Sequence, residues 1–190
     1  MRAIAARAGV SLATPYNLFG SKRAIVLAVL EDVREFHERF SRLHPVNGLD
    51  RIFQALSLTL NYYVGDPDFY RTLWASVFDT SGKEVRTALI NPQSYAFWRA
   101  LVDQADREGS FLADIDIDSL LRSLDFTFGA VMLNWALGEL VAEELEPAVG
   151  LGYALALRGA ATPEAAVGLE KRVIQYQKQV LALRKRASAA

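Results

Sequence analysis

Residues 4–23 read IAARAGVSLATPYNLFGSKR, and they form the most informative local pattern of the chain. A short first helix is expected over residues 2–8, because its apolar residues fall on one face. Gly9 can then adopt the left-handed turn conformation that ends a helix. Val10 is expected to point inward after this turn. The pattern therefore predicts a helix that stops sharply and a chain that changes direction.

A second short helix is expected over residues 12–19. Ser11 is a good N-cap for it, and Gly20 can close it. Pro15 would be the fourth residue of that helix, where it removes the first intrahelical hydrogen bond and can tilt the helix. Two short helices joined through a glycine are the arrangement of a helix-turn-helix motif, whose second helix enters the DNA major groove by its N-terminal turn.

Charge is unevenly distributed along the chain. Residues 1–44 contain seven Lys/Arg and four Asp/Glu, a net charge of +3, whereas the whole chain of 190 residues carries −1. A positive end on a slightly acidic remainder suits contact with phosphate by that end.

The rest of the chain repeats apolar residues with helical period, so the expected fold class is all-α. A long helix is expected over 22–42, and the most apolar one, over 118–140, should be central. Glycine and proline positions mark the remaining expected helices, which cover about 48–64, 67–77, 92–108, 146–157 and 163–186. We expect two domains, a head over 1–44 and a helical body over 45–190.

Residues 4–25 resemble the DNA-binding segment of the tetracycline-repressor (TetR) family of bacterial regulators. The matching positions are Ile4, Ala5, Ala8, Gly9, Val10, Ser11, Tyr16, Phe19, Lys22 and Ile25. The resemblance implies a ligand-responsive transcriptional regulator with a helix-turn-helix head and a dimeric, effector-binding body. Family members have one more helix before this pair, so we expect that the natural start lies upstream or that the preceding part was removed or not recorded.

The resemblance also implies which residues meet double-stranded DNA. Leu12, Ala13 and Thr14 would face base edges, while Tyr16 and Lys22 would hold phosphates. Their chemistry agrees, because a threonine hydroxyl can donate and accept at base edges and Asn17 can reach bases or backbone. The alternative is that the apolar members are simple core and Tyr16 is an interface aromatic of a helical bundle.

Aromatic side chains are frequent in the body, and isolated polar groups interrupt its apolar stripes. Such residues are often plain core, but a buried amide or hydroxyl needs a neighbour, a water or a ligand. We therefore predict a pocket for a small apolar or aromatic effector with one or two hydrogen-bonding groups. Its expected lining is Phe53, Asn61, Tyr62, Tyr63, Tyr70, Trp74, Trp98, Thr127, Phe128 and Asn134.

A homodimer is also implied by the resemblance, with a four-helix bundle formed by segments 118–140 and 146–157 of each subunit. Small residues that would permit close approach are Ser123, Ala130, Gly138, Gly150 and Gly152. Packing within one chain explains any one of them equally well. The last helix, 163–186, can pack on the body or extend the interface.

Catalysis is not expected, and neither is a cofactor or a metal. The chain has no cysteine, no glycine-rich phosphate loop and no nucleophile elbow. The only histidines, His37 and His44, are seven residues apart, a spacing that suits no helical metal pair.

A cytoplasmic protein that does not enter the membrane is expected. The uncharged stretch 126–138 in the most apolar part has only 13 residues, against the roughly 20 that span a bilayer, and the N-terminus lacks the pattern of a secretory signal. The sequence favours a repressor released from its operator by the effector; the alternative is a dimeric ligand-binding or scaffold protein that does not bind DNA.

Overall fold

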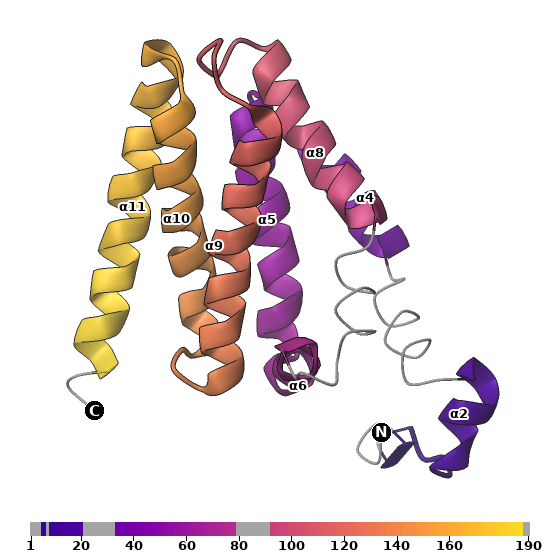
Figure 1. The fold of residues 1–190 in the computed structure, drawn as a ribbon. Coiled ribbons are helices and arrows are strands. Elements are labelled where there is room, and N and C mark those ends of the chain that lie inside the picture. The colour runs from indigo at the N-terminus through magenta and orange to yellow at the C-terminus, as the bar shows by residue number, and fades with distance from the viewer. Residues whose placement is uncertain (1–4, 7, 21–32, 79–91, 188–190) are drawn as a thin grey trace.

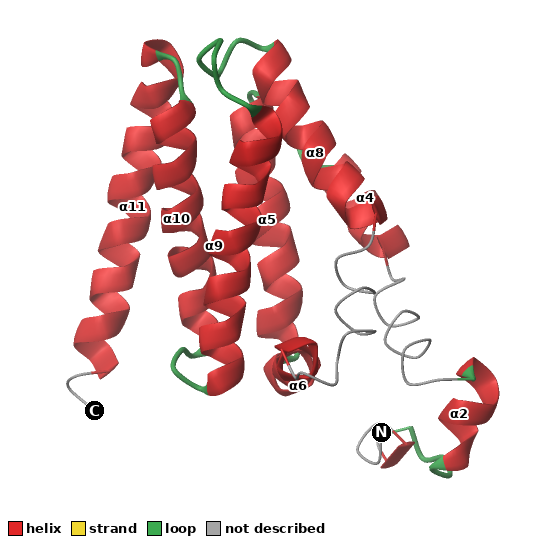
Figure 2. Ribbon diagram, viewed as in Figure 1, coloured by secondary structure: helices red, strands yellow, loops and turns green. Residues whose placement is uncertain are grey.

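A computed structural model describes residues 5–6, 8–20, 33–78 and 92–187 of the chain, and its elements there are helical (Figure 2). Within these residues the only strand-like pairing is an isolated bridge between Phe111 and Ala161. The predicted all-α class is confirmed for this part of the chain. The helices are α2 (Ala13–Phe19), α4 (Val33–Ser41), α5 (Gly48–Gly65), α6 (Pro67–Phe78), α8 (Pro92–Arg107), α9 (Ile117–Leu137), the short 3-10 helix η1 (Ala142–Glu144), α10 (Leu145–Ala160) and α11 (Pro163–Ala187).

Short polar side chains and glycines determine where the body helices begin and end. Asn47 accepts a hydrogen bond from the Asp50 backbone N–H at 2.8 Å and so caps α5. Asp116 caps α9 in the same way through the Ser119 N–H at 2.9 Å. Gly138 ends α9 with φ +89°, a backbone conformation that other residues rarely adopt.

Helix α10 is at the centre of the packing. It contacts α11 and α9 on its two sides and also touches α5 and η1 (Figure 1). Its inner residues Leu145, Val149 and Leu157 are completely buried. The sequence predicted a central helix over 118–140, and α9 also meets several helices: it packs on α10, α6 and α8, and it touches α5 through Tyr63, while one part of its surface stays exposed.

Helices α5 and α8 approach each other closely at one end of the bundle. Gly48, the first residue of α5, is buried, and a Cβ added to it would lie 2.7 Å from the Ala105 Cα of α8. The Gly48 N–H donates to the Glu108 Oε2 at 2.6 Å. A residue without a side chain is therefore needed where α5 begins.

Helix α4 is joined to the body by two phenylalanines. The Phe36 and Phe40 rings both meet the Phe97 ring of α8 edge-on, with centroids 5.4 and 5.2 Å away. Phe40 is buried, and Phe36 also contacts the Tyr62 ring of α5 at 6.4 Å. The C-terminal part of the predicted helix 22–42 is confirmed; residues 22–32 lie outside the described part.

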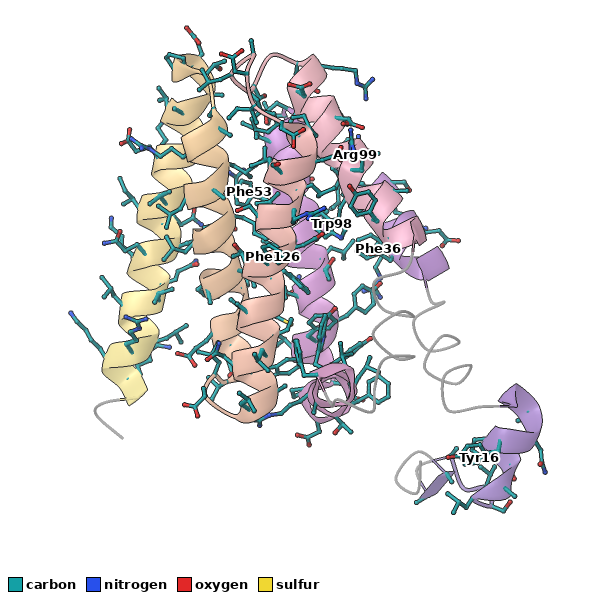
Figure 3. The ribbon with its side chains drawn as sticks, in the orientation of Figure 1. Tyr16, Phe36, Phe53, Trp98, Arg99 and Phe126 are labelled. Atoms are coloured by element: carbon teal, nitrogen blue, oxygen red, sulfur yellow. The ribbon has the colours of Figure 1, made fainter. Side chains whose placement is uncertain are left out.

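A further link between α8 and α9 is ionic. Arg99 on α8 pairs with Asp118 in the first turn of α9 and, within its own helix, with Asp103 (Figure 3).

Among the described helices, none is long and apolar enough to cross a membrane.

Candidate functional site

The N-terminal segment 5–20 contains the predicted turn and second helix. Gly9 has φ +65°, and the Val10 N–H donates to the Ala5 carbonyl at 3.0 Å, which closes the turn after the first helical residues. Gly20 has φ +75° and its N–H donates to the Tyr16 carbonyl at 2.7 Å. Both glycines therefore have the turn role predicted for them.

Two details of this segment differ from the prediction. Ser11 does not cap the helix with its side chain, because its Oγ lies 2.8 Å from the Thr14 Oγ1 and the two hydroxyls hydrogen-bond to each other. The helix consequently begins at Ala13, so Pro15 is its third residue, where a backbone N–H has no intrahelical partner to lose. Val10 was expected to point inward but is 41% exposed, since no described neighbour covers it.

The predicted DNA-contacting residues lie together at the start of α2. Leu12, Ala13, Tyr16 and Asn17 are exposed, and Thr14 is half-buried. Ala13, Tyr16 and Asn17 share one helix face because they are three and four residues apart. Figure 3 shows Tyr16 on α2. Lys22 lies outside the described residues. A methyl group, a phenol and an amide are thus presented on one exposed surface.

The predicted pocket residues divide into groups, and the largest is an aromatic cluster. The ring of Tyr63 on α5 lies 4.8 Å from Tyr70 and 6.3 Å from Trp74, both on α6. It also lies 6.5 Å from Phe128 and 6.1 Å from Trp135, both on α9. These five residues, the Tyr63 cluster, include four of the ten predicted, and Trp135 is the fifth member.

Two polar atoms inside the Tyr63 cluster are of chemical interest. Burial raises the pKa of the Tyr63 hydroxyl above its usual range, so this group stays a neutral phenol. The neighbouring Trp74 indole lowers this pKa, but the two groups do not reach hydrogen-bond geometry. Nε1 of Trp74 is therefore buried without an accepting atom among the described residues. An unsatisfied donor in an aromatic environment can bind a ligand acceptor.

Three predicted aromatics lie away from this cluster. Phe53 faces α11, where its ring stacks on Tyr176 at 6.1 Å. Trp98 of α8 meets Tyr153 of α10 edge-on at 6.4 Å. The Tyr62 ring lies under the Arg39 guanidinium of α4 at 5.4 Å. The structure therefore does not bring these three together with Tyr63.

The three polar residues expected to be buried are not isolated in the core. Asn61 and Asn134 are exposed, and the Asn134 Nδ2 donates to the Ala130 carbonyl at 2.8 Å. Thr127 is half-buried and donates to the Ser123 carbonyl at 2.9 Å. The expectation that these polar groups are buried is wrong for both asparagines, and solvent or the backbone of the same helix satisfies them. Buried polar atoms that this reasoning missed include Nε1 of Trp74 and Oε1 of Gln54.

An apolar surface remains uncovered on α9 and α10. Phe126 and Leu137 of α9 are 71% and 69% exposed, and Leu155 of α10 is 53% exposed. Phe126 and Leu137 are eleven residues apart, about three helical turns, so they share one face with the exposed Leu133 between them. We call the four residues Phe126, Leu133, Leu137 and Leu155 the α9–α10 face.

Three of the glycines considered for subunit contact have roles within the chain. A Cβ at Gly150 would lie 2.5 Å from the Tyr176 ring of α11, and one at Gly152 would lie 2.4 Å from the Thr127 Cγ2 of α9. Gly138 ends α9 beside Arg71, whose Nε donates to the Trp135 carbonyl at 3.0 Å. For these positions, the intrachain alternative is the correct one.

The described residues contain no group of three or more His, Asp or Glu side chains placed to bind a metal. His44 is exposed, and the side chain of His37 lies outside the described part.

No family model matches the chain, and no curated protein or solved structure is significantly similar to it. A function must therefore be argued from the segment 5–20, the Tyr63 cluster and the α9–α10 face.

Proposed function

We propose that the chain is a dimeric, ligand-responsive DNA-binding regulator that represses transcription until a small effector lowers its affinity for the operator. The observation that carries this proposal is the sharp turn at Gly9 followed by α2, on which Ala13, Tyr16 and Asn17 are exposed together. A helix presented in this way fits the major groove, and the resemblance of residues 4–25 to the TetR family leads to the same role.

Each exposed group of α2 suits one kind of DNA contact. The Tyr16 hydroxyl can hold a phosphate, and the Asn17 amide can pair with an adenine edge. The Thr14 hydroxyl already bonds to Ser11, so it would meet a base through its remaining hydrogen-bonding capacity or through its methyl group. Lys22 would add a phosphate contact.

The Tyr63 cluster is the proposed effector site. Its rings offer apolar and stacking contacts, and the Trp74 Nε1 offers one directed hydrogen bond. These features favour a planar aromatic effector that carries an acceptor such as a carbonyl oxygen. A charged effector is disfavoured, because the cluster contains no ionised side chain to pair with it.

Helix α5 supplies a physical route from effector to head. Tyr63 contacts α6 and α9, whereas its neighbour Tyr62 contacts Phe36 and Arg39 of α4. An effector that shifts the end of α5 would therefore shift α4, which leads towards the head. Such a ligand acts only if it binds the two positions of α4 with different affinity.

Dimerisation is proposed through the α9–α10 face. Three of its four large apolar side chains are more than half exposed, which suits an interface with a second copy. Two heads on one dimer would read two half-sites about one helical turn of DNA apart, which is how short recognition helices gain specificity.

The deciding experiment is selection of duplexes from a random-sequence pool, followed by fluorescence-anisotropy titration of the enriched site at two salt concentrations. We expect an inverted repeat to be enriched and its affinity to fall as salt rises. The titration is repeated with a chain that carries an additional N-terminal helix, as family members have. A folded dimer that enriches no sequence in either form would contradict the proposal and favour a ligand-binding or scaffold protein.

Substitutions in α2 test the contacts themselves. Asn17→Ala should weaken binding to the selected site by at least tenfold, within the ~1–3 kcal/mol of a base-specific contact. Gln179→Ala, which removes an exposed amide from α11, is the matched control and should leave affinity unchanged.

A further inference from the structure

An open cavity of about 600 Å³ lies where the start of α5, the connection after α8 and the first half of α11 meet. Residues of the Tyr63 cluster do not line it, so it is distinct from the proposed effector site. Its volume is in the range of small-molecule sites. Its charged lining consists of Asp50, Glu108, Glu164, Lys171 and Arg172.

Two of the three acids are already occupied by donors of the protein. Glu108 accepts from the Gly48 N–H through Oε2 and from the Gln104 side chain through Oε1, at 2.6 and 2.9 Å. Asp50 accepts from the Val46 N–H through Oδ2 at 3.2 Å and pairs with Arg172 through Oδ1. These carboxylates hold the wall of the cavity together and are poorly placed to bind a ligand.

Arg172 is engaged in the same way. Its guanidinium pairs with Asp50 and lies 4.4 Å from the centroid of the Phe53 ring. Lys171 and Glu164, in contrast, form no ion pair with any described residue. The cavity therefore presents one unpaired positive group and one unpaired negative group, and both belong to α11.

The backbone positions of these two exposed residues along α11 indicate the length of a ligand. Glu164 and Lys171 are seven residues apart, which is about 10 Å along a helix that rises 1.5 Å per residue. An extended tripeptide also spans about 10 Å from end to end. Its ammonium can pair with Glu164, its carboxylate with Lys171, and a zwitterion adds no net charge to a cavity whose acids outnumber its bases.

From this match we infer that the cavity binds short peptides with free termini, of about three residues, along α11. Apolar lining residues such as Val46, Leu49 and Leu169 suit small aliphatic side chains in such a peptide. This inference does not depend on DNA binding or on the effector site.

The probes are trialanine, its N-acetylated form and its C-terminal amide, each titrated calorimetrically into the full chain. Trialanine is expected to bind with millimolar affinity and to shift the backbone NMR signals of residues 46–50 and 162–172. Blocking either end is expected to weaken binding about threefold to fivefold, the value of one solvent-accessible ion pair.

Charge variants identify which end meets which residue. In Lys171→Gln the amide should bind as well as trialanine, and in Glu164→Gln the acetylated peptide should do so, because the lost pair no longer contributes. Lys178→Gln, seven residues further along α11, is the control and should behave as the unaltered chain. The inference is wrong if trialanine does not bind at about 10 mM, if the blocked peptides bind to the unaltered chain as well as trialanine does, or if the shifted signals belong to α6 and α9.

Discussion

Gly48 controls how closely α5 approaches α8. A Cβ at this position would lie 2.7 and 2.8 Å from the Cα and N atoms of Ala105, and backbone atoms cannot turn away as the end of a side chain can. Gly48→Ala is therefore expected to lower the free energy of unfolding by ~1–3 kcal/mol, the usual cost of overpacking. Urea-induced unfolding followed by circular dichroism measures this change.

The control for this substitution is Gly168→Ala in α11. No atom lies within 4 Å of a Cβ placed there, so alanine should increase the free energy of unfolding by roughly 0.5–1 kcal/mol through its better helix propensity. Equal losses at both positions would show that steric contact with Ala105 is not the cause.

Glu108 makes stability depend on pH. The hydrogen bond from the Gly48 N–H, and then that from Gln104, lower the pKa of this carboxyl below its usual value. The folded state thus favours the carboxylate. Its stabilisation is complete above the pKa that Glu108 has in the unfolded chain, and it is lost as the pH falls through the lower pKa that Glu108 has in the folded chain. The stability difference between the native chain and Glu108→Gln should be constant near neutral pH and shrink below about pH 4.5.

Thermal unfolding of both proteins between neutral and acidic pH tests this. Glu143→Gln is the control, since Glu143 is exposed on η1 and caps nothing there. A difference for Glu108→Gln that grows as the pH is lowered would contradict the assignment.

At the scale of elements, the α9–α10 face makes a specific prediction about association. Phe126→Glu and Leu137→Glu each place a charge where a second copy is proposed to bury an apolar side chain. Each should raise the dimer dissociation constant at least 100-fold, equivalent to about 2.8 kcal/mol. Sedimentation velocity over a range of protein concentrations measures it.

Leu112→Glu provides the comparison, because Leu112 is also an exposed leucine but lies in the connection between α8 and α9. It should leave association unchanged. A monomeric native chain, or equal effects of all three substitutions, would mean that the α9–α10 face has another role.

Helix ends were the most predictable elements. Pro67 and Pro163 are the first residues of α6 and α11, and Gly109 has the positive φ expected of a residue that stops a helix. Gly138 is the exception, because the predicted helix 118–140 ran past it and α9 ends at Leu137. Proline and glycine act through their own backbone, so their effect can be deduced from local sequence. The all-α class follows for the same reason, since helical period is also a local property.

The partners of each helix face were much less predictable. The sequence placed Phe53, Trp98 and Tyr63 in one pocket, yet their rings face α11, α10 and α6 with α9, respectively. Apolar periodicity identifies the inward side of a helix, but not the helix that it meets. Asn134 shows the same limit for polar groups, because its position on an outer face is decided by which helices cover α9.

For the whole molecule, the proposed regulator requires that dimerisation and DNA binding be linked. Phe126→Glu, although it lies on α9, should weaken binding to the selected duplex at least tenfold, because separated heads lose the second half-site. Asn17→Ala should weaken DNA binding and leave the dimer intact. Anisotropy titration and sedimentation of the same two proteins measure both effects.

The reverse pattern would be informative in its own right. If Phe126→Glu abolished the dimer and left DNA affinity unchanged, each head would act alone, and the two-half-site arrangement would be wrong.

The Asp50–Arg172 ion pair joins the first helix of the bundle to the last across 122 residues of chain. Phe53 of α5 likewise stacks on Tyr176 of α11. Contacts between such distant residues can form only after α11 has left the ribosome. The side of α5 that carries Asp50 and Phe53 therefore stays uncovered until α11 is synthesised. Because α11 is synthesised after the helices that it covers, a nascent chain released before α11 would leave Phe53 of α5 and the α11-facing side of α10 uncovered and open to aggregation.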